Sequence, residues 1–183
     1  MSEKKIGDLR LPHDIDIHTH SGPARRDAVL CVDPVDETDL PEGDGLLSVG
    51  VHPWNAERVT EETWARLERW LADGRVVAIG EVGLDKLRGG ETAVQLAVFE
   101  RQIELGKRHG LPLVIHCVRS WDSLLAARGR HADSGQWIVH GFRGKAALAK
   151  QLLGAGMDLS FGKLRNEEAY ECVPAERRYH ETD

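Results

Sequence analysis

DIDIHTH, at residues 14–20, decides the fold of this chain, because it joins a short apolar run directly to two histidines. A short apolar run that leads to one histidine or glutamate returns in VVAIGE at residues 76–81, LVIHCV at 113–118 and WIVH at 137–140. Near-continuous apolar runs of this length are typical of strands buried on both faces, as in parallel sheets. When parallel strands close into a barrel, their C-terminal ends meet at one mouth. The pattern therefore predicts an α/β fold, a TIM-like (β/α) barrel whose mouth collects histidines and carboxylates.

The rest of the chain supplies further elements in an order that fits such a barrel. We expect the remaining strands at residues 28–32, 46–52, 157–161 and 178–183, the last being the eighth. Apolar residues at helical spacing predict helices at residues 60–72, 94–109, 120–127 and 145–153. Only short connections rich in Pro, Gly and Asp separate the first three strands, so little helix is expected there.

The length limits how such a barrel is built. The chain has 183 residues, which predicts one domain over residues 1–183. A full eightfold barrel typically takes roughly 250 residues. We therefore expect a compact barrel with short or missing helices and an incomplete C-terminal end.

The composition indicates a protein of the reducing cytoplasm. The chain is 41% hydrophobic, and no apolar run is long enough to span a membrane. The first ten residues lack the apolar core of a signal peptide. The cysteines Cys31, Cys117 and Cys172 are odd in number and lack zinc-finger spacing. We expect free thiols, a cytoplasmic location and no membrane partner.

The net charge bears on the substrate. Proteins that grip long duplex DNA show a basic face, whereas this chain carries a formal charge of −6 and has no Lys/Arg block. A nucleic-acid substrate would then be contacted locally, at an end. The same acidity favours an alternative substrate, a small molecule with an amide, ester or lactone bond.

His18 and His20 form the first candidate metal pair. They are two residues apart in an expected strand, so their side chains leave the same face. Two ordinary surface histidines are the alternative, but the flanking Ile15 and Ile17 favour a buried site. Glu81 ends the fourth expected strand, and its two oxygens could each take one of two ions; a solvated loop acid is the alternative.

His116 and His140 end the fifth and sixth expected strands. A single histidine there is commonly a hydrogen-bonded core residue, but two on successive strands after Glu81 favour a shared metal. Asp183 ends the last run, where its carboxylate could bind the first ion and act as a base.

Together these residues predict a centre for two divalent ions. Two cations roughly 3.5–4 Å apart can hold both the attacking and the leaving oxygen of a displacement, and they activate water near neutral pH. Mixed imidazole and carboxylate ligands suit Zn²⁺ or Mn²⁺, while oxygen-rich positions suit Mg²⁺. We expect Glu81 and Asp183 to be catalytic, and six metal ligands: His18, His20, Glu81, His116, His140 and Asp183.

Cations follow the same expected strands and could bind the phosphate of a substrate. Lys86 follows Glu81, while Arg119 and Arg143 each follow a histidine by three residues. Arginine suits phosphate because its planar fork donates two parallel hydrogen bonds. His52 could add a further hydrogen bond and Trp54 an aromatic wall, although the indole could instead be plain packing.

Taken in order, these blocks resemble the TatD family of metal-dependent hydrolases, and most of all its short bacterial members. The resemblance covers residues 16 to 183. The blocks that carry it are DIHTH (16–20), SVGVHPW (48–54), AIGEVGLDK (78–86), FERQIEL (99–105), LVIHCVR (113–119), WIVHGFRGK (137–145), LSFG (159–162) and ETD (181–183).

The resemblance implies a barrel of the amidohydrolase superfamily that carries two metals and acts on phosphodiesters, as a deoxyribonuclease. Carried over by position, His18 and His20 match the first-metal pair and Glu81 the bridging carboxylate. His116 and His140 match the second-metal histidines, and the last aspartate of the ETD block a ligand and base.

The C-terminus departs from the family pattern. Members continue past ETD with a final helix, whereas this chain stops on Asp183. Residues 177–180 read RRYH, which is poor for a doubly buried strand. We therefore expect that the chain lacks its natural C-terminus or is degenerate, with an inactive remnant as the alternative to an active hydrolase.

Overall fold

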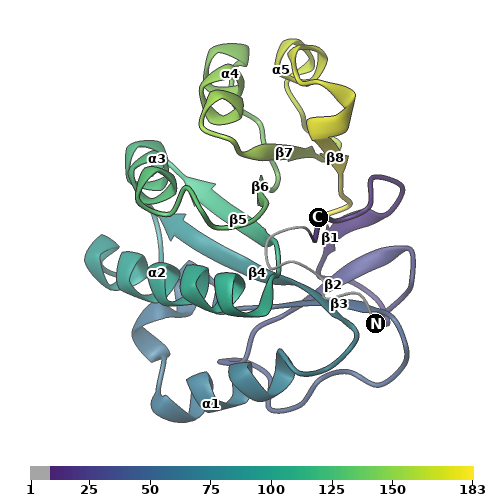
Figure 1. The fold of residues 1–183 in the computed structure, drawn as a ribbon, viewed down its shortest axis with the longest axis vertical. Helices are drawn as coiled ribbons and strands as arrows, with labels where there is room; N and C mark the ends of the chain where they lie inside the picture. Colours follow the sequence, from purple (N-terminus) through teal and green to yellow (C-terminus); the bar gives the residue numbers. More distant parts are fainter. Residues whose placement is uncertain (1–8) are drawn as a thin grey trace.

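The computed structural model of this chain describes residues 9–183, in which eight parallel strands close into a barrel in sequence order (Figure 1). All eight strands expected from the sequence are present. Their bounds are β1 Asp16–Thr19, β2 Ala28–Val32, β3 Leu46–Val49, β4 Val76–Asp85, β5 Leu113–Val118, β6 Trp137–Val139, β7 Asp158–Phe161 and β8 Arg178–His180.

Helices cover the outside of the barrel mainly from β3 onward, and the four expected ones are confirmed within a few residues. The helix α5 and the 3-10 turns η1 and η2 were not expected from the sequence. The helical elements are η1 Pro53–Arg58, α1 Glu61–Trp70, α2 Thr92–His109, α3 Trp121–Arg130, α4 Ala146–Gly154, α5 Glu167–Cys172 and η2 Ala175–Arg177. No helix within residues 9–183 is long and apolar enough to cross a membrane.

The helix ends follow local chemistry. Thr60 caps α1, because its side chain accepts from the Thr63 amide while the Thr63 side chain accepts from the Thr60 amide. The longest helix, α2, ends at Gly110, whose φ of 66° suits a residue without a Cβ. These local signals set the lengths of the helices that pack on the strands.

Two apolar clusters fill the fold. The larger one lies between the strands and the helices and includes Phe99 and Leu67. The smaller one joins side chains of six strands: Ile17, Val29, Ala78, Val114, Ile138 and Tyr179. Side chains two positions apart in a strand share a face. On β5 and β6, the residue two positions after a member of this cluster therefore lies in the next layer toward the mouth.

Strand β4 differs from its expected length. It runs for ten residues, from Val76 to Asp85, so Glu81 lies inside the strand and not at its end. Its pairing with β5 is irregular between Ile79 and Val82, directly at the glutamate. The sequence predicts the end of the strand at Glu81 because the carboxylate interrupts the apolar run, whereas pairing with β5 extends β4 to Asp85.

Strand β8 is short, but it closes the barrel. It pairs with β7 through three residues and with β1 through Asp16 and His180. Of the two arginines in RRYH, Arg177 lies in η2 and contacts Asp158, and the Arg178 guanidinium lies 4.2 Å from the Tyr170 ring centroid. The segment is poor for a doubly buried strand, yet it closes the barrel, because only one side chain of β8 is buried.

That side chain, Tyr179, yields the first prediction. Its hydroxyl accepts from Gln136 Nε2 at 2.6 Å and donates to the Leu11 carbonyl at 3.3 Å, and its ring is 2% exposed. Tyr179→Ala should lower the free energy of unfolding in urea by about 3–5 kcal/mol through the cavity it leaves. Tyr179→Phe should cost about 1 kcal/mol. The exposed neighbour provides the control: His180→Ala should change stability by about 0.5 kcal/mol or less. Equal effects of the two alanine variants would contradict this assignment.

Candidate functional site

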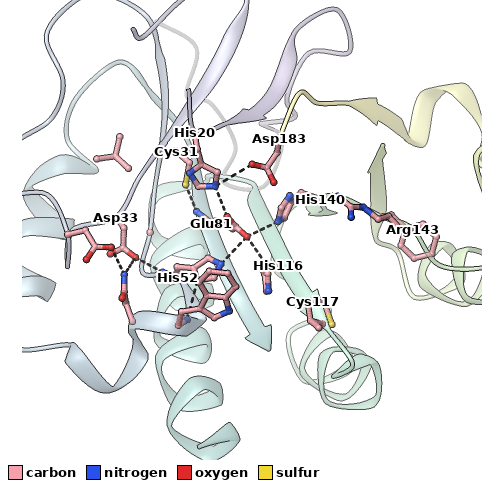
Figure 2. A pocket seen from close by; sticks show the side chains of 18 of the residues that line it. His20, Cys31, Asp33, His52, Glu81, His116, Cys117, His140, Arg143 and Asp183 are labelled. Carbon is pink, nitrogen blue, oxygen red and sulfur yellow. Dashed lines mark hydrogen bonds and ion pairs between the residues drawn. The ribbon is translucent and has the colours of Figure 1, made fainter. Parts of the chain in front are cut away.

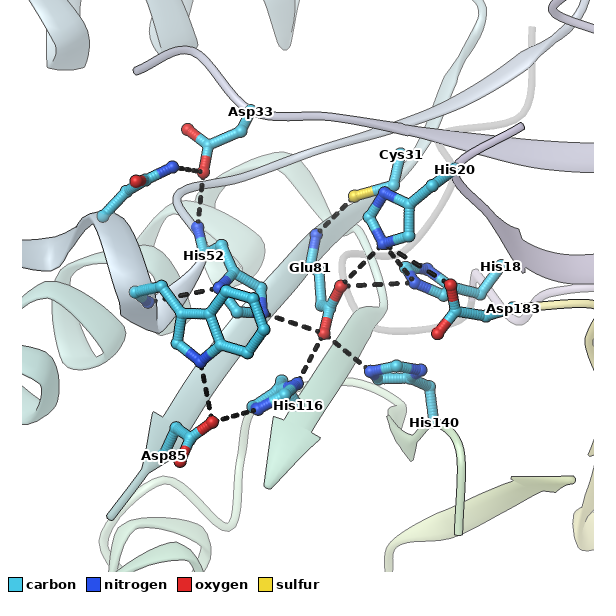
Figure 3. Close-up of polar contacts among 12 residues, drawn as sticks. His18, His20, Cys31, Asp33, His52, Glu81, Asp85, His116, His140 and Asp183 are labelled. Atoms are coloured by element: carbon cyan, nitrogen blue, oxygen red, sulfur yellow. Dashed lines mark hydrogen bonds and ion pairs between the residues drawn. The ribbon is translucent and has the colours of Figure 1, made fainter. Parts of the chain in front are cut away.

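The buried carboxylate of Glu81 lies at the centre of the barrel mouth (Figure 3). Its Oε1 lies 2.7 Å from His116 Nδ1, 2.7 Å from His140 Nε2 and 3.2 Å from His52 Nε2. These histidines come from β5, from the end of β6 and from the connection after β3. One carboxylate oxygen therefore faces three imidazoles from different parts of the chain.

The second oxygen of Glu81 faces the histidine pair of β1. Oε2 lies 3.1 Å from His20 Nε2 and 3.3 Å from His18 Nε2. The two Nε2 atoms are themselves 3.1 Å apart. Asp183 reaches the same place, with Oδ1 3.9 Å from His20 Nε2. All six residues expected to be metal ligands are thus brought together.

A close approach of β4 and β5 makes this gathering possible. Gly83 has a φ of 136°, and a Cβ at this position would lie 2.1 Å from the His116 carbonyl oxygen. Only glycine fits such a conformation and such a contact. On the other side, the Glu81 amide donates to Cys31 Sγ at 3.0 Å, which ties β4 to β2.

A second set of carboxylates holds two of the histidines from behind. Asp85 Oδ2 lies 3.0 Å from His116 Nε2 and also accepts from Trp54 Nε1 at 2.7 Å. Glu181 Oε2 lies 3.7 Å from His140 Nδ1 and accepts from the Gly141 amide. A carboxylate behind an imidazole fixes the orientation of the ring and strengthens the nitrogen on its other side.

The charges of the site favour an ionised glutamate. Burial by itself would raise the pKa of Glu81, but the surrounding histidines, His140 foremost, hold that pKa well below its ordinary value. Burial likewise opposes protonation of His140, yet the charge of Glu81 and the nearby carboxylate of Glu181 raise its pKa to about 10. Burial and the charge of His140 lower the pKa of His18.

The donors present at this site fit divalent cations. Nδ1 of His18 is buried with no hydrogen-bond partner among residues 9–183, while its Nε2 faces a second imidazole. Two imidazole lone pairs beside a carboxylate oxygen are satisfied together by a cation, whereas only one shared proton fits between the two rings. Four groups have ligand atoms within 4.8 Å of one another: His18, Cys31 and Glu81; His18, His20 and Asp183; His52, Glu81 and His116; His140, Glu181 and Asp183.

A cavity of about 1290 Å³ opens above these donors, and two of the residues expected to bind phosphate line it. Arg119 and Arg143 both line it, and His52 lies at its floor beside Glu81. Arg119 is the one residue other than glycine with a positive φ in the described part of the chain, at 51°. Such backbone conformations cluster at functional sites. Lys86 is exposed and is not among the lining residues, so its phosphate role stays a prediction.

Three residues of the site were not expected from the sequence: Cys31, Asp85 and Glu181. Each lies two positions after a buried residue of its strand, namely Val29, Gly83 and Tyr179. The period of two could have placed all three on the inner face. Their contacts with Glu81, His116 and His140 depend on strand register, which the sequence does not display.

Comparison with known proteins gives a consistent picture. The model of a family described as "TatD related DNase" matches residues 38–183. The Mycobacterium tuberculosis protein named "Uncharacterized metal-dependent hydrolase TatD" is 35% identical over 149 residues, which cover 74% of this chain and 56% of that protein. The Erwinia billingiae protein named "3'-5' ssDNA/RNA exonuclease TatD" is 33% identical over 146 residues, with the same two coverages. The chain thus spans about half the length of the curated relatives it matches.

Among solved structures, a TatD family hydrolase from Entamoeba histolytica has the same fold. It superposes with a TM-score of 0.71 at 24% identity, over 85% of this chain and 60% of that one.

The pKa of His140 leads to a prediction for the metal-free protein. Because its folded pKa of about 10 lies above its ordinary 6.5, the contribution of His140 to stability is complete below pH 6.5 and is lost as the pH rises toward 10. In EDTA, the unfolding free energy of the unaltered protein minus that of His140→Gln should shrink across this range, as measured by urea titration at each pH. A difference that stays constant from pH 7 to pH 10 would contradict the assigned ion pair.

Proposed function

The chain belongs to the TatD family of metal-dependent hydrolases, and on this premise we propose that it hydrolyses phosphodiester bonds at the 3′ ends of single-stranded nucleic acid. The observation that carries the proposal is the Glu81 carboxylate: one oxygen faces the histidine pair of β1, and the other faces His116 and His140. Relatives named as 3'-5' ssDNA/RNA exonucleases support the choice of substrate.

Two divalent ions, Mg²⁺, Mn²⁺ or Zn²⁺, would be held around this carboxylate. We assign His18, His20 and Asp183 to the first ion, His116 and His140 to the second, and Glu81 to both; the mutual distances of their ligand atoms support this grouping. When bound, such ions polarise the phosphoryl oxygen and make water a stronger nucleophile at neutral pH.

The residues of the chain supply the other parts of the reaction. A water oxygen bonds to phosphorus while the bond from phosphorus to the leaving sugar oxygen breaks, and that oxygen takes up a proton from solvent at the open mouth. We assign Asp183 as the base, because its carboxylate is 38% exposed and faces the mouth, where it can accept the proton of that water. Glu81 and His52 keep the site polar, and Arg119 and Arg143 bind the phosphate.

We also propose the cytoplasm as the location of the protein. The cysteines Cys31, Cys117 and Cys172 are all free thiols, which suits a reducing compartment.

Metal dependence gives the central test. EDTA-stripped protein should not hydrolyse bis-p-nitrophenyl phosphate or a short labelled single-stranded DNA, and added Mg²⁺, Mn²⁺ or Zn²⁺ should restore turnover. Glu81→Gln keeps the size of the side chain but removes the charge that both ions need. It should reduce kcat by about 100-fold or more and lower the bound metal measured by mass spectrometry.

His116→Ala provides a second point in the same assays and should behave like Glu81→Gln. Full activity in this variant would refute the assigned centre. Hydrolysis of amides or lactones without any phosphodiester turnover would instead support a small-molecule hydrolase.

The two cavity arginines lead to a separate prediction. Arg119→Gln and Arg143→Gln should each raise KM for a single-stranded oligonucleotide by roughly tenfold, because each removes a charge-assisted hydrogen bond to phosphate. The matched control is Lys150→Gln on the exposed face of α4, which should leave KM unchanged. Equal KM values for all three variants would show that the arginines do not contact the substrate.

A further inference from the structure

The mouth of the barrel has two oppositely charged sides. In a closed ring of eight strands, β2 and β6 are four positions apart and so lie across from each other. The connection after β2 carries Asp33, Asp36 and Glu37, here called the acidic wall, all of which line the cavity. Arg119 and Arg143 follow β5 and β6. Figure 2 shows Asp33 and Arg143 on opposite sides of Glu81.

Two carboxylates of the acidic wall, those of Asp33 and Asp36, accept hydrogen bonds from neighbouring donors. Asp33 Oδ2 accepts from the His52 amide at 2.9 Å and from Asn55 Nδ2 at 2.9 Å. Asp36 accepts from Asn55 Nδ2 at 2.7 Å and pairs with Arg58 at 2.9 Å.

Glu37 lines the cavity, and its side chain has no ion-pair partner among residues 9–183. In the described part of the chain, the only cation besides Arg58 that contacts this segment is Arg66, through the Pro34 and Glu37 carbonyls, and Arg66 also pairs with Glu62. Acids therefore outnumber cations on this side of the mouth.

Trp54 lines the same cavity as the acidic wall, and its ring centroid lies 4.7 Å from that of His52. The residue is 45% exposed, although it is large and apolar. Its Nε1 donates to Asp85 Oδ2 at 2.7 Å, and the Arg88 guanidinium lies 4.7 Å from the ring centroid. Its ring centroid is 6.0 Å from that of His116. The indole is therefore held in one orientation with part of its surface free at the mouth.

We propose that Trp54 and the acidic wall form a subsite for the terminal nucleoside of a strand. The base stacks on Trp54, the scissile phosphate lies at Glu81, and the rest of the strand leaves across Arg119 and Arg143. A second phosphate beyond the terminal sugar would meet Glu37, so the site selects a free 3′-hydroxyl end. This inference rests on the proposed function and adds to it the reason for end selectivity.

Binding without turnover tests the acidic wall. The probes are 5′-fluorescein hexathymidylates ending in a 3′-hydroxyl or a 3′-phosphate, titrated with EDTA-treated protein and followed by anisotropy. The unaltered protein should prefer the 3′-hydroxyl probe. Glu37→Gln should reduce this preference by about threefold or more, because a nearby like charge is removed. The effect should fade in 1 M salt, where the Debye length is about 3 Å.

The matched control for the charge change is Glu171→Gln on α5, an exposed acid outside the cavity. It removes the same charge and should leave the preference between the two probes unchanged. No preference in the unaltered protein, or the same change in both variants, would overturn the role of the acidic wall.

A pair of Trp54 variants tests the stacking surface. Trp54→Leu should weaken binding of the 3′-hydroxyl probe roughly tenfold. A probe whose terminal nucleotide is abasic should bind Trp54→Leu and the unaltered protein with equal affinity. Trp54→Phe keeps a ring and should keep most of the affinity. Equal losses for both probes would mean that Trp54 is plain packing and would overturn the subsite.

These outcomes are separate from failure of the proposed function. A protein that prefers the 3′-hydroxyl probe but cleaves no phosphodiester with any metal retains the subsite and loses the assigned activity. A protein that cleaves both probes equally, with no binding preference, retains the activity and loses the subsite.

Discussion

Glu81, a residue that is 3% exposed, places its carboxylate inside the barrel mouth. An ionised group in a barrel interior is costly unless it is compensated by charge and hydrogen bonds. Here five imidazoles face its two oxygens, and they come from β1, from β5 and from the connections that follow β3 and β6. Compensation of this kind requires the barrel to close, because in an open sheet these strand ends would lie far apart.

The barrel meets this requirement in layers with few residues. An apolar layer that includes Val114, Ile138 and Tyr179 supports the mouth from below. The next inward positions on the same strands are His116, His140 and Glu181. Behind the histidines, Asp85 and Glu181 orient the rings. Rigid strands and second carboxylates together keep the ligand atoms in place, which is what a metal-dependent hydrolase needs from its scaffold.

The same ring of strands also sets the polarity of the mouth. Because β2 and β6 lie opposite each other, the acids that follow β2 and the arginine that follows β6 face one another across Glu81. A polyanion would enter such a mouth from the basic side and stop at the acidic one. The overall acidity of the chain is therefore compatible with a nucleic-acid end as substrate, since contact with an end requires no basic face.

The sequence by itself determined the eight strands, most of the helices and the six candidate metal ligands, because apolar runs and the residue types at their ends are local signals. It did not reveal the length of β4, the closure of the barrel by β8 or the supporting residues Cys31, Asp85 and Glu181. Asp85, two residues after Gly83, is indistinguishable in sequence from a loop acid, but the pairing of β4 with β5 puts its carboxylate 3.0 Å from His116. Arg178 is an unusual residue for a barrel strand, and only the fold shows that its guanidinium lies over the ring of Tyr170, from α5. Contacts of this kind join residues that are distant in the chain, so only the tertiary structure decides them.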